Sequence, residues 1–263
     1  MVSCIFGLYV TVVVTLGART QVPAPNPDQL FVEREDLSHA ERAEAIWKSR
    51  PASDFEAAWK QARADYWIGG HAPQESARRA ALESGVAAAT RAAGLDAQRP
   101  EGYFWRAANM GALAESFGIM QGVRYRGRIK SDLETVLRID APWQQGSADR
   151  ALGRWYAKVP GLFGGSDKDA EAHYRASLKY NANSTASLFF LSELLFAHKQ
   201  NAEATELLRR ILDAPVDPDW APEDREFKSL ATSTCRSLHL TCGRSSPPAP
   251  SASATSAPQT SGL

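Results

Sequence analysis

The sequence has few cysteines, few histidines and no excess of charge, and these shortages exclude several classes of function. Its 263 residues include 3 Cys and 5 His, and its 30 Lys and Arg balance its 30 Asp and Glu. A protein that binds nucleic acid or an anionic membrane through its surface field needs an excess of basic residues. We therefore expect neither kind of partner.

Motifs of common catalytic chemistry are also missing. The sequence has no Gly-x-Ser-x-Gly nucleophile elbow, no Ser-x-x-Lys pair and no His-Glu-x-x-His zinc motif. Its glycine cluster at 161–165 lacks the Gly-Lys-Ser/Thr ending of a phosphate loop. Paired acids such as Asp167 and Asp169 fall at helix starts, where the helix dipole favours them. We expect a protein that is not an enzyme and that holds no cofactor and no metal.

One long apolar run is present, at residues 1–18. It carries no charged residue and ends at Gly17 and Ala18, before Arg19 and a proline-rich stretch. A membrane-spanning helix needs about 20 apolar residues, so the run fits a signal peptide better. We expect export to the periplasm or the medium, with a retained membrane anchor as the alternative.

Two cysteines would remain after removal of a signal peptide. Cys235 and Cys242 are close in sequence, and an exported protein can close such a pair into a small disulfide loop. Two free thiols are the alternative reading.

The rest of the chain predicts helices. We expect a linker at 19–37, a helical-repeat domain at 38–240 and a disordered tail rich in Pro, Ser and Ala at 243–263. Capping boxes that begin with Ser38 and Ser53 mark the first two helices. In the second, an aromatic stripe that includes Trp59 and Tyr66 indicates core packing. Further helices are predicted at 77–93, 100–117, 120–139, 148–158, 169–180, 184–198, 202–212 and 222–238. Asn183 is expected to cap the helix at 184–198.

A repeat connects these helices. Small and bulky residues at Leu191, Ser192, Leu195, Ala204, Leu208 and Ile211, closed by Pro215, match a tetratricopeptide unit. An earlier unit has Leu152, Gly153, Tyr156, Ala170, Tyr174 and Ser177 at the same offsets. Ala170 and Ala204 lie 34 residues apart, which is the tetratricopeptide period. The fold class predicted is all-α, an α-solenoid of three to four helical hairpins, with a nonrepetitive bundle as the alternative.

The earlier unit has a turn about five residues too long, at 159–165, and this segment carries a family resemblance. The sequence from Leu152 to Gly165, with Gly153, Trp155, Pro160, Gly161 and Gly164, resembles the T component of tripartite ATP-independent periplasmic transporters. It resembles the regulators of microtubule dynamics more distantly. The resemblance implies a periplasmic helical-repeat protein that forms oligomers and associates with a solute-binding protein. T components are typically lipoproteins, but Cys4 lies at the start of the apolar run and not after it, which departs from that pattern.

A binding groove is expected on the concave side, which the first helix of each hairpin lines. The residues expected there are Arg150, Arg154, Lys158, Phe189, Glu193 and Phe196, extended by Trp105, Arg106 and Asn109. A basic row beside two phenylalanines suits a protein partner, a peptide or a small acidic organic ligand. The alternative is that Arg154 pairs with Glu193 while both phenylalanines are core. A general scaffold with no link to transport is the alternative function.

Overall fold

The computed structural model describes residues 25–242, and within this range the chain is helical and has no strand. The signal segment and the tail expected from the sequence lie outside the described residues. The helices are α1 (Pro27–Val32), α2 (Leu37–Lys48), α3 (Phe55–His71), α4 (Glu75–Leu95), α5 (Pro100–Ser116), α6 (Ile119–Asp140), α7 (Trp143–Lys158), α8 (Asp167–Tyr180), α9 (Thr185–Ala197), α10 (Asn201–Asp213) and α11 (Ala221–Ser237), with short 3₁₀ turns η1 (Gly161–Phe163) and η2 (Pro218–Trp220).

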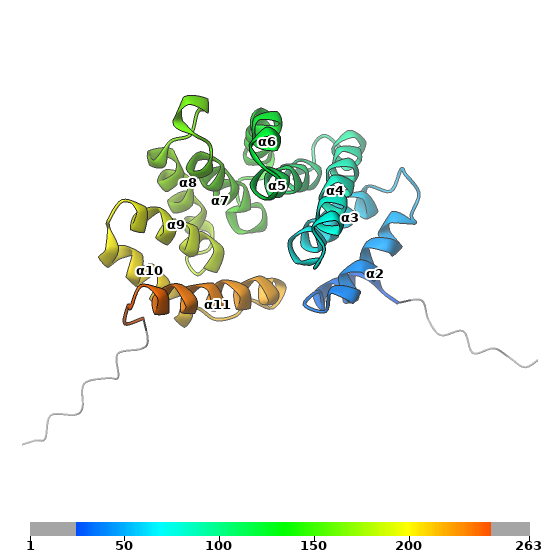
Figure 1. Cartoon of the computed structure of the whole chain (residues 1–263). Helices are drawn as coiled ribbons and strands as arrows, with labels where there is room; N and C mark the ends of the chain where they lie inside the picture. Colours follow the sequence, from blue (N-terminus) through cyan, green and yellow to red (C-terminus); the bar gives the residue numbers. More distant parts are fainter. Residues whose placement is uncertain (1–24, 243–263) are drawn as a thin grey trace, which may run out of the picture.

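Each helix packs chiefly against its neighbours in sequence, and the pairs follow one another around a curved array (Figure 1). Contacts between alternate helices join α3 to α5, α5 to α7, α7 to α9 and α9 to α11. This pattern places the odd-numbered helices in an inner layer. The predicted α-solenoid is therefore confirmed.

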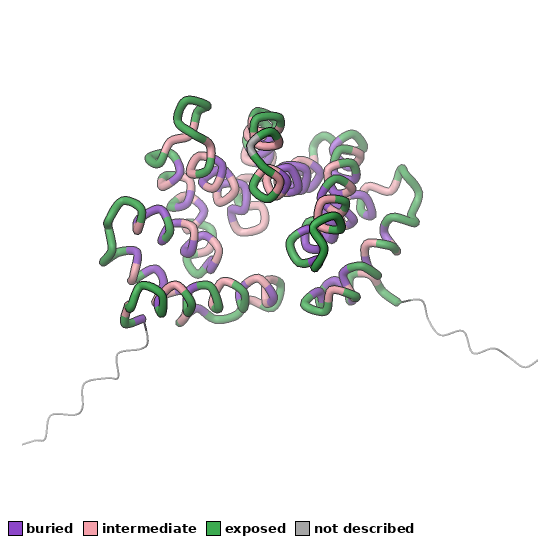
Figure 2. Tube along the Cα trace, viewed as in Figure 1, coloured by how far each residue is buried: buried purple, intermediate pink, exposed green. Residues whose placement is uncertain are grey.

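The core is divided into three clusters along the array. One lies between α1 and α4, the second between α3 and α7, and the third between α7 and the segment after α11. Buried residues follow the contacts between neighbouring helices, whereas the outer turns are exposed (Figure 2). Such a division is typical of repeat proteins, in which each hairpin is stabilised mainly by its neighbours.

Small residues set the spacing between the helices of a hairpin. A Cβ added at Gly153 of α7 would lie 2.5 Å from the ring of Tyr174 on α8. At Gly102 of α5 it would lie 2.4 Å from the backbone nitrogen of Ala93 on α4. The predicted repeat positions thus pack as a tetratricopeptide unit requires.

Several local expectations need correction. The predicted linker contains α1, which begins at the Asn26 cap with proline in its first turn, a combination that starts helices. The caps of α2 and α3 are Asp36 and Asp54, whose carboxylates accept backbone N–H bonds in place of the neighbouring serines. Similarly, Ser184 caps α9, and the expectation for Asn183 was wrong.

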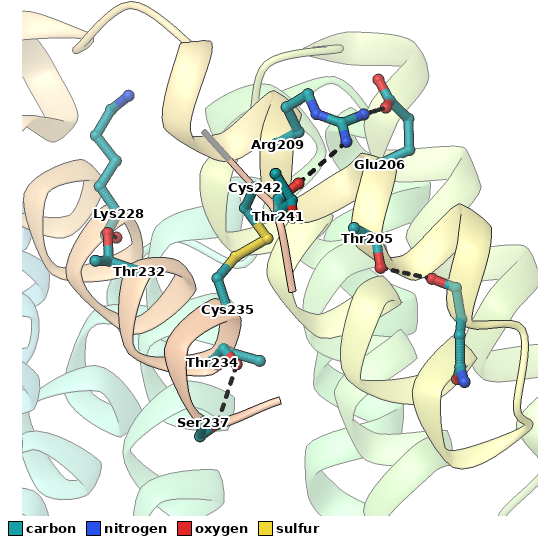
Figure 3. The surroundings of a disulfide bond; sticks show 11 residues. Thr205, Glu206, Arg209, Lys228, Thr232, Thr234, Cys235, Ser237, Thr241 and Cys242 are labelled. Carbon is teal, nitrogen blue, oxygen red and sulfur yellow. Dashed lines mark hydrogen bonds and ion pairs between the residues drawn. A yellow bond between two sulfur atoms is a disulfide. The ribbon is translucent and has the colours of Figure 1, made fainter. Parts of the chain in front are cut away.

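The C-terminal end of α11 is closed by a disulfide between Cys235 and Cys242 (Figure 3). The bond holds the segment after α11 against α10, where Arg209 donates to the Thr241 carbonyl at 3.4 Å. Lys228 of α11 donates to the carbonyls of Ile211, Leu212 and Ala214, at 2.6–2.9 Å. A cation at these carbonyls caps the C-terminus of α10.

Candidate ligand cavity

The two ends of the array approach each other (Figure 1), and the concave side between them holds a cavity that is partly open to solvent. Its volume is about 1710 Å³. Residues of α1, α3, α5, α6, α7, α9, η1, η2 and α11 line it, whereas α2, α4, α8 and α10 contribute none. The odd-numbered helices of the inner layer, together with one face of α6, therefore form its wall, as expected of a solenoid.

Charged side chains join the ends of the array. Arg34, after α1, is buried and donates to both carboxylate oxygens of Glu223 on α11. Arg225 and Glu35 form a second, exposed pair. His71 of α3 lies 3.7 Å from the carboxylate of Glu226. We call these three pairs the seam.

A basic row follows one face of α7. Arg150, Arg154 and Lys158 are spaced four residues apart, and all three line the cavity as their spacing predicted. Arg154 is paired, since it donates to Glu115 at 2.9 Å and to Glu193 at 3.0 Å. The Arg150 guanidinium makes no hydrogen bond or ion pair with any residue in 25–242, and it lies 5.9 Å from the centroid of the Trp220 ring.

The α9 residues expected in the groove are placed differently. Phe189 and Phe196 pack in the third core cluster, and Glu193 pairs with Arg154 outside the cavity wall. The expectation that these three line the groove was wrong, and the alternative reading holds. Phe190 lines the cavity instead, because one residue turns the helix by about 100°.

On α5, Trp105 lines the cavity, but its predicted neighbours do not. Arg106 is buried and donates to Asp132 of α6 at 2.7 and 2.8 Å. Asn109 is fully buried beside Gly85 and donates to the carbonyl of Ala62 at 3.0 Å. Both residues connect helices. Sequence periodicity could not separate these contacts from a groove, because a polar residue on an inner helix fits either reading.

The segment that carries the family resemblance is a compact loop. Gly164 has a φ of +100°, and a Cβ at Gly165 would lie 1.6 Å from the Val159 carbonyl oxygen, so both positions favour glycine. Pro160 precedes η1, which begins at Gly161. The indole of Trp155 donates to the Arg126 carbonyl at 2.9 Å and thereby attaches α7 to α6. Gly153, Gly161, Gly164 and Gly165 lie outside the cavity wall, whereas Trp155 and Pro160 belong to it.

A strained turn opens α7 beside the cavity. Gln144, Gln145 and Gly146 have φ of 45°, 58° and 73°, a left-handed run in which two residues are not glycine. Gln145 donates to Asp217 at 2.9 Å and accepts from Asn181. Gln144 also lines the cavity, and its buried amide oxygen has no partner. Such strain concentrates at functional sites.

Tyr66 was expected in the core but lines the cavity, with 41% of its surface exposed. Its ring packs 5.8 Å from that of Trp105. The surrounding helices partly shield both Tyr66 and Arg150 from water, which raises the pKa of Tyr66 and lowers the pKa of Arg150. No sequence signal separated Tyr66 from its buried neighbours, since it shares their helical spacing.

The fold and cavity define the chain as a helical-hairpin repeat protein. The family model of the TRAP transporter T-component matches residues 41–240, and the chain belongs to this family. No curated protein matches it.

Two solved structures are similar. TTC0263, a thermophilic TPR protein of Thermus thermophilus, superposes with a TM-score of 0.60 at 18% identity, covering 80% of this chain and 97% of that one. MamA superposes with a TM-score of 0.47 at 12% identity, covering 80% of this chain and 99% of its own. The likeness to TTC0263 shows a shared fold. No helix of residues 25–242 combines the length and hydrophobicity needed to cross a membrane.

Proposed function

We propose that this chain is an accessory binding protein of a tripartite transporter, which holds a small organic molecule in its central cavity. The cavity carries the proposal, and membership of the T-component family supports the link to transport. Export from the cytoplasm belongs to the same proposal, since a disulfide is stable outside the reducing cytosol.

The size of the cavity favours a small ligand over a folded partner. Its volume of 1710 Å³ equals a sphere about 7 Å in radius, whereas a domain of 100 residues has a radius of gyration of about 13 Å. Most small-molecule pockets measure about 300–1,000 Å³. The cavity therefore has room for one organic molecule with water around it.

A protein partner would meet the outer surface. Leu162 in η1 and Met120 in α6 are 89% and 77% exposed and lie outside the cavity wall. Exposed apolar side chains of this size are typical of interaction sites. We propose that a solute-binding protein contacts this surface. Homo-oligomer formation stays a prediction.

Native mass spectrometry of the protein purified from the periplasm tests the cavity. We expect a retained small molecule in the wild type and its loss in Gly111→Phe, because Gly111 lines the cavity and a Cβ there meets no atom within 4 Å. Gly70→Phe is the matched control, since Gly70 has equal space but lies outside the cavity. Equal occupancy in both variants would place the molecule elsewhere.

The transport link is tested by copurification with a solute-binding protein encoded beside this gene. We expect Leu162→Glu to weaken the complex while Gly111→Phe leaves it intact. Absence of any complex, or of such neighbouring genes, would favour a general scaffold.

A further inference from the structure

We infer that a second pocket, formed where α2, α3 and α4 meet, binds a dianionic phosphate group. It shares no lining residue with the central cavity, so it is a site separate from the one proposed above. Its polar lining residues are Lys48, Arg50, Gln61, Ser84 and Arg91, and the others are alanines.

Every charged residue that lines this pocket is a cation. Lys48, Arg50 and Arg91 line it, and no Asp or Glu of residues 25–242 does, although the whole chain carries equal numbers of both signs. The Lys48 ammonium pairs with Glu44 at 3.1 Å. The Arg50 guanidinium is exposed and makes no hydrogen bond or ion pair within the described chain. The pocket therefore keeps an excess of positive charge.

Arg91 of α4 is held in place without being saturated. Its Nη2 donates to Oε1 of Gln61 at 2.9 Å. Gln61 is itself buried, and its amide nitrogen donates to Ser84 and to Asp65, both at 3.3 Å. The Nε of Arg91 is buried and has no hydrogen-bond partner among residues 25–242. A buried donor without an acceptor is unfavourable, and an anion beside this guanidinium would supply the acceptor.

The buried Asp65 carboxyl does not oppose an anion here. Asp65 bonds to Gln61 and does not line the pocket. Burial, and after it the Glu44 carboxylate, raise the pKa of Asp65 to about 8. Asp65 is therefore mostly neutral at pH 7, while the charge of Glu44 is balanced by Lys48.

The size and charge of the pocket favour a phosphate group over an organic acid. Its volume of about 280 Å³ equals roughly nine water molecules and lies below the range of about 300–1,000 Å³ that is usual for organic ligands. A phosphate monoester carries about 1.5–2 negative charges at pH 7 and three acceptor oxygens, so it can pair with more than one guanidinium. A carboxylate has a single charge and would leave one of Arg50 and Arg91 without a partner.

Isothermal titration calorimetry of the purified chain, at pH 7 and constant ionic strength, tests this site with inorganic phosphate, glycerol 3-phosphate and acetate. We expect both phosphates to bind more tightly than acetate. Arg91→Gln should weaken phosphate binding by about 10- to 100-fold, the effect of one charged hydrogen-bonding pair. Arg50→Gln should weaken it by about 2- to 5-fold, because Arg50 is exposed. Arg42→Gln is the matched control, since Arg42 is an exposed arginine of α2 outside the pocket.

The two phosphates distinguish the sources of the ligand. Tighter binding of inorganic phosphate would identify the free ion, and tighter binding of glycerol 3-phosphate would identify an ester. If neither binds, if acetate binds as tightly, or if Arg42→Gln weakens binding as much as the two pocket variants, the inference is wrong.

Two further measurements keep the result unambiguous. Thermal unfolding checks that Arg91→Gln is folded, and if it is not, Arg50→Gln decides, since that substitution removes no side-chain contact within the described chain. Gly111→Phe, which fills the central cavity, should leave phosphate binding unchanged; a loss there would place the phosphate in the central cavity and overturn the assignment to the second pocket. Failure of this site leaves the proposed function to its own test by native mass spectrometry.

Discussion

Replacing Glu223 by Gln should weaken the seam, so that the two ends of the helical array separate more often. The substitution keeps the size of the side chain and removes the charge that holds Arg34, of which 4% is exposed. Arg34 would keep its bonds to the Phe31 and Asp219 carbonyls, at 3.1 and 3.4 Å, and lose the ion pair and one of its two bonds to residue 223. The substitution hardly changes the free energy of the unfolded protein, so it destabilises the folded state in which the two ends of the array meet.

The magnitude follows from these contacts. Hydrogen bonds to charged groups contribute about 1.5–3 kcal/mol each, but the Glu223 side chain is 26% exposed and solvent screens part of the pair. We expect a loss of about 1–2 kcal/mol, which multiplies the open population by roughly 5 to 30. Because Arg34 directly follows α1, the opening should appear first in that helix.

Hydrogen exchange followed by mass spectrometry measures this opening. Peptides that cover α1 should exchange faster in Glu223→Gln by the factor above, while peptides of α8 and α10, outside the cavity wall, should be unchanged. Glu35→Gln is the matched control, since it breaks the exposed pair with Arg225 and should have little effect. If α1 exchanges equally fast in both variants, or if it exchanges in Glu223→Gln as slowly as in the wild type, Arg34 and Glu223 do not hold the two ends of the array together.

Three further predictions concern the scaffold. Cys235→Ser with Cys242→Ser should lower the free energy of unfolding by about 2–2.5 kcal/mol, measured by urea denaturation, because the disulfide closes a short loop; an unchanged midpoint would contradict this. Burial alone would lower the pKa of His71, but the Glu226 carboxylate and the Trp67 carbonyl raise it, and His71 in turn lowers the pKa of Glu226. Between the ordinary pKa values of 4.5 for Glu226 and 6.5 for His71, both side chains are charged, so the melting temperature of the wild type relative to His71→Gln should be highest near pH 5–6. This difference should fall as the pH rises through the His71 pKa, and it should fall again in acid as Glu226 is protonated. A difference that does not change with pH would show that the two side chains do not form an ion pair. Gly102→Ala should destabilise by about 1–3 kcal/mol through its clash with α4, whereas Gly94→Ala, with open space, should be neutral or stabilising; equal effects would argue against close packing there.

Much of the fold could be predicted from the sequence, because helix periodicity, terminators and small residues all point to the same array. The repeat offsets at Gly153 and Tyr174, for example, correspond to a buried contact between α7 and α8. Helix starts were predicted less accurately. Asp36 and Ser38 can both cap a helix, and only the backbone conformation decides which of them does. α1 was missed because its proline-rich sequence also fits a linker.

The site could be predicted only along one helix. Spacing placed Arg150 and Lys158 on the cavity because a period of four defines a helix face. It failed for Arg106 and Asn109, whose partners Asp132 and Ala62 lie on other helices. No local pattern encodes such contacts. The meeting of the two ends of the array was also missed, since it depends on pairs 189 and 190 residues apart.

The division of the core into three clusters has a consequence for the seam. Each hairpin meets the next at a joint whose angle depends on a few close approaches, such as those at Gly102 and Gly153. Small rotations at successive joints have the same sense and add up along the chain, so they reach their largest displacement where the first and last helices face each other. Substitutions far from the cavity will therefore alter its width, and the gap at the seam reports the curvature of the whole molecule.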